Sequence, residues 1–443
     1  MVPSELPRRP ARRPRPQRPD ALPARSADRR RRRRGPDDLH AASASVPHAR
    51  RPDPRPLRRP LHGHADQGSG QRRQPGARRA LRPDRVPTLQ VRVVVDVSPL
   101  SHPRTGVGNY IRGSLLAAEG AHELVAFAPA TASGRREIET ALDGIPVEHC
   151  VPTLPLAHAV RTAWSKLGRP PVERVVGPLD AFHFSDWMYP QQRGGIRSTM
   201  VHDLVPLRFP AWVHPRTRRM HAAKYRHAAR TCDLVFTNSR FTADDVVELL
   251  GVPADRVRVA YPGVDEQFTR DGPRAELGGP YVLSVATLEP RKNLQTLVDA
   301  FRLLGDGIQL AVAGSAGWGA QPQLDVPGVR LLGYTPYAEL SSLYRGAQAF
   351  VYPSRFEGFG MPVVEAMACG TPCVVSSHPS LDEACGDAAV RIDPESPEAI
   401  AAGIKRAVAE RAELSRRGRE HAARFTWHEN GRVHLDAFAA ALA

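Results

Sequence analysis

The sequence predicts an α/β protein made of two doubly wound domains, each built on a parallel sheet. Three observations lead to this expectation. From residue 91 onward, mostly apolar runs typical of strands buried on both faces alternate with amphipathic helical stretches. The alternation stops at a polar stretch containing Gly and Pro, residues 266–280, and then restarts. The length of 443 residues also exceeds one ordinary domain of about 150 residues.

The first domain is expected over residues 91–265. It opens with Val91–Val97, a run of the kind that a buried parallel strand requires. The later strands are separated by helical stretches or loops, which is the order of a doubly wound sheet. The further strands expected here are 123–128, 181–184, 198–202, 234–237 and 257–261, and the clearest helices are 107–119 and 241–250.

The second domain is expected over residues 281–425, after the linker 266–280. It repeats the alternation of the first domain, and the last stretch, 426–443, has a helical pattern of its own. The strands expected in this domain are 281–286, 308–313, 329–332, 349–352 and 373–376, and the helices are 293–304, 337–345 and 362–369.

Residues 1–90 differ in composition from the rest. They contain 24 Arg and 8 acidic residues, so they account alone for the net charge of +16, and they lack Ile, Phe, Tyr and Trp. Such a segment cannot bury enough apolar surface to fold. It is either a disordered Arg/Pro-rich arm that binds RNA or membrane, or the translation of GC-rich DNA upstream of the true start. The neutral remainder argues against a nucleic-acid binder.

A basic pair lies where a ligand is expected. Ligands of open α/β sheets bind beyond the carboxyl ends of the strands, here in a cleft between the two sheets. Arg291 and Lys292 follow the strand 281–286 and precede a helix, in the stretch Glu289-Pro290-Arg291-Lys292-Asn293. Two cations beside a helix N-terminus suit a diphosphate. The alternative is an ordinary solvated helix start.

Two carboxylates flank a glycine-containing turn after the strand 349–352. The stretch Glu357-Gly358-Phe359-Gly360-Met361-Pro362-Val363-Val364-Glu365 places seven residues between them. Gly358 and Gly360 permit a tight turn whose backbone N–H groups face an anion or sugar hydroxyls. Glu365 falls about one turn into the following helix, where a carboxylate accepts hydrogen bonds from both hydroxyls of a ribose.

Two further motifs lie at the ends of strands in the first domain. Gly106 and Gly108 follow the first strand and open a helix, so their backbone can approach a leaving phosphate. His202 and Asp203 lie at the end of the strand 198–202 and would point into the cleft. A histidine here is either a core residue or a functional group, and Asp203 either orients its loop or caps the next turn.

Together these motifs resemble the retaining GT-B glycosyltransferases grouped with glycogen and sucrose synthases, particularly bacterial mannosyltransferases of polysaccharide assembly. The resemblance covers residues 91–443. It implies two Rossmann-like domains that face an interdomain cleft, with the nucleotide-sugar donor on the second domain and the acceptor on the first. It also implies that the helix 426–443 crosses back to the first domain. The family usually has a Gly pair where this chain has Arg104-Thr105-Gly106.

The resemblance assigns roles to the residues. Arg291 and Lys292 would hold the donor diphosphate, Glu365 the ribose, Glu357 and the following glycine turn the donor sugar, and His202 would lie near the reacting centre. The expected catalytic residues are His202, Arg291, Lys292 and Glu357. The expected donor-binding residues are Gly106, Gly108, Gly358, Phe359, Gly360, Met361, Pro362 and Glu365.

No cofactor or metal is expected. The chain contains no Asp-x-Asp, the carboxylate pair that commonly holds Mg²⁺ or Mn²⁺ against a diphosphate, so cationic side chains would stabilise the leaving group instead. The five cysteines are scattered without a metal-ligand spacing, which favours packing roles. The implied reaction is metal-independent transfer of a hexose, mannose from GDP-mannose, to a polysaccharide or glycolipid.

A helix over residues 214–230 raises the question of partners. It carries Arg216, Arg218, Arg219, Lys224, Arg226 and Arg230. This is either a solvated face or a surface that docks on an anionic membrane or on the phosphates of a lipid-linked acceptor. No run of apolar residues is long enough to span a bilayer, so we expect a cytoplasmic protein, alternatively a peripheral one on the inner face of the plasma membrane.

Other functions remain open at this stage. The residues named above would bind parts that all nucleotide donors share, so a UDP-sugar is an alternative donor. A non-catalytic nucleotide-sugar-binding scaffold is another alternative, against which the intact charged residues argue. A dinucleotide oxidoreductase is disfavoured because the first strand–helix turn lacks a GxGxxG.

Overall fold

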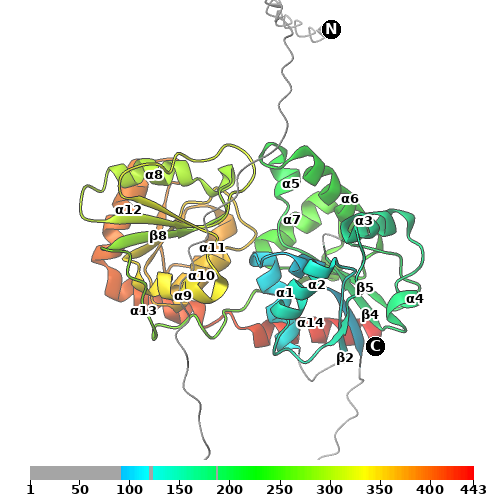
Figure 1. Ribbon diagram of the computed structural model, residues 1–443. Helices are drawn as coiled ribbons and strands as arrows, with labels where there is room; N and C mark the ends of the chain where they lie inside the picture. Colours follow the sequence, from blue (N-terminus) through cyan, green and yellow to red (C-terminus); the bar gives the residue numbers. More distant parts are fainter. Residues whose placement is uncertain (1–90, 119–122, 186–187) are drawn as a thin grey trace, which may run out of the picture. The chain divides into compact units, whose positions relative to one another are not determined.

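The computed structural model describes residues 91–118, 123–185 and 188–443 (Figure 1). Residues 1–90, for which the sequence predicts an arm or a misassigned start, lie outside these ranges. The described residues form two parallel sheets, one of seven strands and one of six. The α/β class and the two doubly wound domains are therefore confirmed.

The first sheet has the strand order β3-β2-β1-β4-β5-β6-β7, and all neighbouring strands in it are parallel. This order places the first strand in the middle of the sheet, as its apolar run predicts. The short edge strand β3 was not expected from the sequence. The strands are β1 (Arg92–Asp96), β2 (Glu123–Phe127), β3 (Glu148–Cys150), β4 (Ala181–Phe184), β5 (Ile196–Val201), β6 (Leu234–Thr237) and β7 (Val257–Val259).

Helices cover both faces of the first sheet. Val93 of β1 belongs to a buried core formed with α1, α2 and the C-terminal helix α14, whereas the next residue, Val94, belongs to a core formed with α3, α6 and α7. Successive side chains of a strand point to opposite faces, so the apolar run supplies both cores. The helices are α1 (Gly106–Ala117), α2 (Ala132–Ala141), α3 (Ala157–Leu167), α4 (Glu173–Val176), α5 (Val205–Arg208), α6 (Pro215–Thr231), α7 (Arg240–Leu250) and α14 (Trp427–Leu442).

The second sheet has the order β10-β9-β8-β11-β12-β13 and is also covered on both faces. Leu283 of β8 packs with α9 and α10, and Val282 packs with α8 and α12. The edge strand β13 and the helices α11, α12 and α13 add to the expected elements. The elements are β8 (Tyr281–Val285), α8 (Leu294–Arg302), β9 (Gln309–Ala313), β10 (Val329–Gly333), α9 (Tyr337–Gly346), β11 (Ala349–Tyr352), α10 (Met361–Ala368), β12 (Cys373–Ser376), α11 (Asp382–Cys385), β13 (Val390–Ile392), α12 (Pro397–Ala409) and α13 (Arg411–Ala422).

The last helix, α14, packs against α1 of the first domain (red and cyan in Figure 1). At the start of α14 the Trp427 ring lies over Gly113 of α1, where a Cβ would fall only 2.2 Å from the ring. One turn later, Asn430 donates to the Tyr110 hydroxyl at 2.9 Å and accepts from Ser114 Oγ at 2.8 Å. The end of the chain therefore completes the core of the first domain.

The helix α6 requires one correction to the sequence analysis. Lys224 does not belong to its basic face, because the side chain is fully buried and its Nζ donates to the carbonyl oxygen of Met200 at 2.6 Å. This hydrogen bond stabilises a charged group that would otherwise be costly to bury. The remaining basic residues of the stretch are exposed: Arg216, Arg218, Arg219, Arg226 and Arg230. Across the described ranges, none of the helices has both the length and the apolar character that a membrane span needs.

Candidate active site

A cleft of about 380 Å³ lies at the carboxyl ends of strands from both sheets. The first domain contributes residues 104–107, 109 and 110, together with His202, Asp203 and Asn238. The second domain contributes the ends of β8, β9 and β11, the turn 357–360 and the first residues of α10. Pockets for drug-sized ligands usually measure about 300–1,000 Å³. The volume of the cleft falls within this range, so the cleft can hold a small-molecule ligand.

Within this cleft, Arg291 and Lys292 both contact the carboxylate of Glu357. Arg291 Nη1 lies 2.8 Å from Glu357 Oε2, and Lys292 Nζ lies 2.6 Å from Glu357 Oε1. Lys292 also donates to the Tyr352 hydroxyl at 2.8 Å, and Arg291 pairs with Glu289 at 3.0 Å. Lys292 has three N–H donors and two of them are used by these partners, so it retains capacity for a ligand oxygen.

The protonation of this cluster follows from burial and charge. Burial opposes ionisation of Glu357, but Arg291 and Lys292 outweigh it and lower the pKa of the carboxyl group to about 2. Burial lowers the pKa of Lys292, an effect that Arg291 reinforces and Glu357 opposes. Glu357 is therefore a carboxylate whose charge is already neutralised by two cations. An anionic ligand would have to share these cations with it.

Glu365, on α10, lines the cleft from the second domain, as the cluster of Arg291, Lys292 and Glu357 does. It is 4% exposed. The hydroxyls of Tyr337 and Tyr344 donate to its two carboxylate oxygens, at 3.2 and 3.0 Å. Burial raises the pKa of Glu365 to about 7, although both tyrosine hydrogen bonds oppose the shift. The carboxyl group thus titrates near neutral pH, and its ionised form can accept further hydrogen bonds from ligand hydroxyls.

The glycine turn between the two carboxylates packs tightly against the first domain. A Cβ on Gly358 would fall 1.8 Å from the carbonyl oxygen of His202, so this position requires glycine. Gly360 has a φ of 106°, in the left-handed region, and precedes the first residue of α10. Phe359 completes the turn, Met361 and Pro362 are the first residues of α10, and residues 357–362 all line the cleft.

His202 follows β5 and lies in the wall of the cleft. Its ring contacts the Tyr110 ring edge-on, with centroids 5.2 Å apart. Asp203 is half-buried, and its Oδ1 accepts from the backbone N–H of Val205 at 3.1 Å. Asp203 therefore caps the turn that follows it, which is one of the two roles expected for it from the sequence. Burial raises the pKa of Asp203, and nearby Arg291 opposes the increase.

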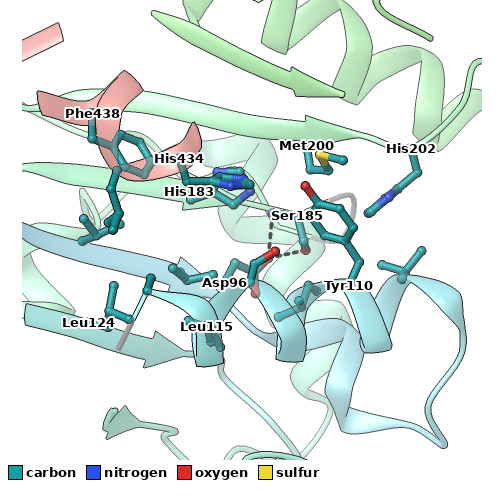
Figure 2. Close-up of a pocket in the computed structure, with 17 residues that line it drawn as sticks. Asp96, Tyr110, Leu115, Leu124, His183, Ser185, Met200, His202, His434 and Phe438 are labelled. Carbon is teal, nitrogen blue, oxygen red and sulfur yellow. Dashed lines mark hydrogen bonds between the residues drawn. The ribbon is translucent and has the colours of Figure 1, made fainter. Parts of the chain in front are cut away.

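His202 and Tyr110 also border a second, mainly apolar pocket of about 60 Å³, shown in Figure 2. This pocket runs between the first sheet, α1 and α14. Figure 2 shows the carboxylate of Asp96 held by Ser185, whose backbone N–H and hydroxyl both donate to it. His202 points toward Tyr110 at the end of the pocket that borders the cleft.

The two glycines expected near a leaving phosphate have different surroundings. Gly106 is the first residue of α1 and lines the cleft, and a Cβ there would meet nothing within 4 Å. Gly108 is buried and is not among the residues that line the cleft. A Cβ on it would lie 3.2 Å from Leu100. The structure therefore gives Gly108 a packing contact and leaves only Gly106 on the cleft surface.

Several cleft residues were missed by the sequence analysis. The guanidinium of Arg104 lies 5.3 Å from the ring centroid of Tyr337, so a cation–π contact crosses from one domain to the other. Asn238 is 9% exposed, and its Oδ1 has no hydrogen-bond partner in the part of the chain that the structure describes. Tyr337 and Tyr344 are seven residues apart, a spacing that puts both on one face of α9 and could have indicated a shared contact.

Comparisons with known proteins give the following matches. Residues 265–425 match the family model Glycosyl transferases group 1, and residues 105–268 match Glycosyltransferase Family 4. The O-antigen chain mannosyltransferase B of Escherichia coli is 28% identical over 377 residues, which cover 76% of this chain and 96% of that protein.

Solved structures share the fold. The sucrose-phosphate synthase of Thermosynechococcus elongatus superposes with a TM-score of 0.60 at 19% identity, over 79% of this chain and all of that one. The HepE protein of Anabaena, solved in complex with UDP-glucose, gives a TM-score of 0.59 at 16% identity over the same shares. These likenesses place the chain among proteins of GT-B architecture.

Proposed function

Because the chain is a group 1 glycosyltransferase, we propose that it transfers mannose from GDP-mannose to a polysaccharide or glycolipid, with retention of configuration and without a metal ion. The similarity to an O-antigen mannosyltransferase supports the choice of sugar and the class of acceptor. The observation that carries the proposal is the cluster of Arg291, Lys292 and Glu357 on the floor of a cleft that also contains Glu365.

The donor would lie along the second domain. Its diphosphate binds Arg291 and Lys292, because charge-assisted hydrogen bonds to buried cations are strong. Its ribose donates to the ionised carboxylate of Glu365. Its sugar lies by Glu357 and the backbone of the turn Gly358–Gly360, facing His202 across the cleft. Gly106 at the start of α1 would approach the phosphate from the opposite wall.

The reaction then depends on stabilising the leaving group. As the bond between the sugar C1 and the phosphate oxygen breaks, negative charge grows on the nucleoside diphosphate, and Arg291 and Lys292 stabilise it while the sugar becomes oxocarbenium-like. The acceptor hydroxyl forms the new bond on the same face, and its proton passes to the departing phosphate oxygen. Glu357 is a poor nucleophile, because two cations already hold its carboxylate. A trapped glycosyl-enzyme on Glu357 would contradict this route.

Thermal unfolding with GDP, UDP or ADP tests the donor. A ligand that binds only the native state raises its stability, so GDP should raise the Tm most. The Lys292→Ala variant should lose most of this shift. A larger shift with UDP would favour the alternative UDP-sugar donor, and the absence of a shift with every nucleotide would contradict a nucleotide-sugar site.

The exposed arginines of α6 support a peripheral partner. Arg216, Arg218 and Arg219 lie on its first turns and face solvent. We propose that they attract an anionic membrane or the phosphates of a lipid-linked acceptor on the cytoplasmic side, at about 1 kcal/mol per basic residue. Flotation with liposomes containing anionic lipid should bring the wild type to the top fraction and leave the Arg216→Ala, Arg218→Ala, Arg219→Ala triple variant behind. Equal flotation of the wild type and the triple variant would contradict the proposed docking by these arginines.

A further inference from the structure

The helix α7 of the first domain begins with a cap that the second domain supplies. The backbone N–H groups of Arg240 and Phe241 donate to the two carboxylate oxygens of Glu383, both at 2.9 Å. Glu383 belongs to α11, 142 residues further along the chain from Phe241. The first N–H groups of a helix have no partner within the helix, and a carboxylate there also interacts favourably with the helix dipole.

Glu383 receives a third hydrogen bond at the point where the chain leaves the first domain. Tyr261, which follows β7, donates its hydroxyl to Glu383 Oε2 at 2.5 Å. The carboxylate therefore accepts three hydrogen bonds from the first domain. Such a group is a strong and directional link, because each donor is fixed by the backbone or by a half-buried ring.

The N-terminus of α7 also contacts the turn Glu357–Gly360, which we call the donor turn because the sugar donor is proposed to lie beside it. The hydroxyls of Ser239 and Thr242 both donate to the carbonyl oxygen of Gly358, at 2.5 and 3.1 Å. Ser239 is the N-cap of α7, and its Oγ also accepts from the N–H of Thr242 at 3.0 Å. One helix terminus of the first domain thus contacts two separate segments of the second domain, at Glu383 and at Gly358.

Those two segments are joined to each other within the second domain. Ser380 lies in the short 3-10 helix Pro379–Leu381, directly before α11, and its Oγ accepts from the backbone N–H of Glu357 at 3.1 Å. The ring nitrogen His378 Nδ1 lies 2.8 Å from the same hydroxyl. The donor turn and α11 therefore form one hydrogen-bonded unit.

We propose that Glu383 is a positioning residue, which caps α7 only when the domains are closed and thereby sets the turn Glu357–Gly360 against His202. The inference rests on the proposed transferase function. It does not make Glu383 part of the donor site, because the groups expected to hold the nucleotide, Arg291, Lys292 and Glu365, lie elsewhere on the second domain. Loss of the cap should therefore impair turnover and leave nucleotide binding intact.

The test compares Glu383→Gln and Glu383→Ala with a matched control in the full chain. Asp382→Asn changes the neighbouring carboxylate on α11, which is exposed and pairs with Arg391 inside the second domain. We expect Glu383→Ala to lower kcat at least tenfold with the Kd for GDP changed less than twofold. The Gln variant keeps one acceptor oxygen and should fall between Ala and wild type. The Asp382 variant should match the wild type in both quantities.

Hydrogen exchange of backbone amides tests the cap without an activity assay. Peptides that contain residues 240–242 should exchange faster in Glu383→Ala than in the wild type or in Asp382→Asn. Wild-type exchange together with wild-type kcat in Glu383→Ala would overturn the inference, as would a parallel loss of kcat, GDP affinity and Tm. If neither the wild type nor any variant transfers sugar from a donor, but amide exchange is faster in Glu383→Ala and not in Asp382→Asn, the cap is supported and the proposed transferase function is contradicted.

Discussion

At the scale of single residues, Glu365 gives the cleft a dependence on pH. Its pKa of about 7 means that the carboxyl group is mostly protonated at pH 6 and mostly ionised at pH 8. The ribose hydroxyls would bind the ionised form. The affinity for GDP should therefore fall about tenfold between pH 8 and pH 6, because a proton must be lost before binding. Isothermal titration calorimetry at pH 6, 7 and 8 measures this.

The Glu365→Gln variant is the control for that experiment. An amide keeps an acceptor oxygen in the same place and does not titrate. The variant should bind GDP more weakly at pH 8, by a factor of about ten or more, since a hydrogen bond to a charged group contributes about 1.5–3 kcal/mol. It should also lose the part of the pH dependence that Glu365 causes. Equal pH slopes in both proteins would show that Glu365 does not contact the donor.

At Asn238 the requirements of protein stability and of sugar transfer should conflict. Asn238 lines the cleft, and its buried Oδ1 has no hydrogen-bond partner among the described residues, so the protein carries the cost of that group, about 1–3 kcal/mol. Asn238→Ala should leave the free energy of unfolding unchanged or raise it, and should reduce transfer. Urea unfolding and a transfer assay measure the two effects.

Asn430 is the matched control for Asn238. It is equally an interior asparagine, but its amide donates to Tyr110, Ala260 and Tyr261 and accepts from Ser114. Asn430→Ala should lower the free energy of unfolding by a few kcal/mol, because those partners are left unsatisfied. A destabilised Asn238→Ala variant with full activity would show that Asn238 is a structural residue.

At the scale of elements, the docking of α14 should be sensitive to acid through His434. Burial lowers the pKa of His434 to about 4, with partial opposition from its hydrogen bond to Asn430. Its ring stacks on Phe236 at 4.2 Å and lies 5.9 Å from the His183 ring. The folded state thus keeps it neutral, whereas the unfolded chain binds a proton below pH about 6.5. Stability is full above that pH and is lost as the pH falls toward 4.

Two variants isolate this effect in urea unfolding. Between pH 7 and pH 5 the His434 contribution amounts to about 2 kcal/mol. His434→Gln should remove that part of the pH dependence, and His428→Gln, at an exposed position of the same helix, should keep it. Identical slopes in both variants would show that His434 does not titrate between the two states.

The elements also show what the sequence could predict and what it could not. Central strands such as β1 and β8 were predicted because burial on both faces leaves an apolar run. The edge strands β3 and β13, each of three residues with one of them charged, were missed, whereas the equally short edge strand β7 was predicted as part of the mostly apolar run 257–261. Their pairing depends on neighbours rather than on their own composition.

The same distinction applies to the cleft. The sequence could indicate four of the residues that line the cleft, because each lies in a short motif that follows a strand. They are Arg291, Lys292, Glu357 and Glu365. The contact of Arg104 with Tyr337 and the cap that Glu383 gives α7 join segments far apart in the chain. Such contacts depend on how the two domains meet, which local pattern does not specify.

At the scale of the whole molecule, each domain holds one part of the proposed reaction. The second domain carries the cations and carboxylates expected to hold the donor, and the first supplies His202, Gly106 and Asn238 on the opposite wall. Neither half alone would complete the cleft. The contacts of α7 with Glu383 and Gly358, and of α14 with α1, connect the halves through both backbone and side chains.

The most direct measurement is transfer of sugar from GDP-mannose by the purified chain in excess EDTA, with and without the Lys292→Ala substitution. If buried cations stabilise the leaving diphosphate, the wild type should work at full rate in EDTA, and the variant should be slower by a factor of 100 or more, since each lost factor of ten corresponds to about 1.4 kcal/mol of barrier. Activity that appears only on addition of Mg²⁺ or Mn²⁺, or a variant as fast as the wild type, would contradict the account.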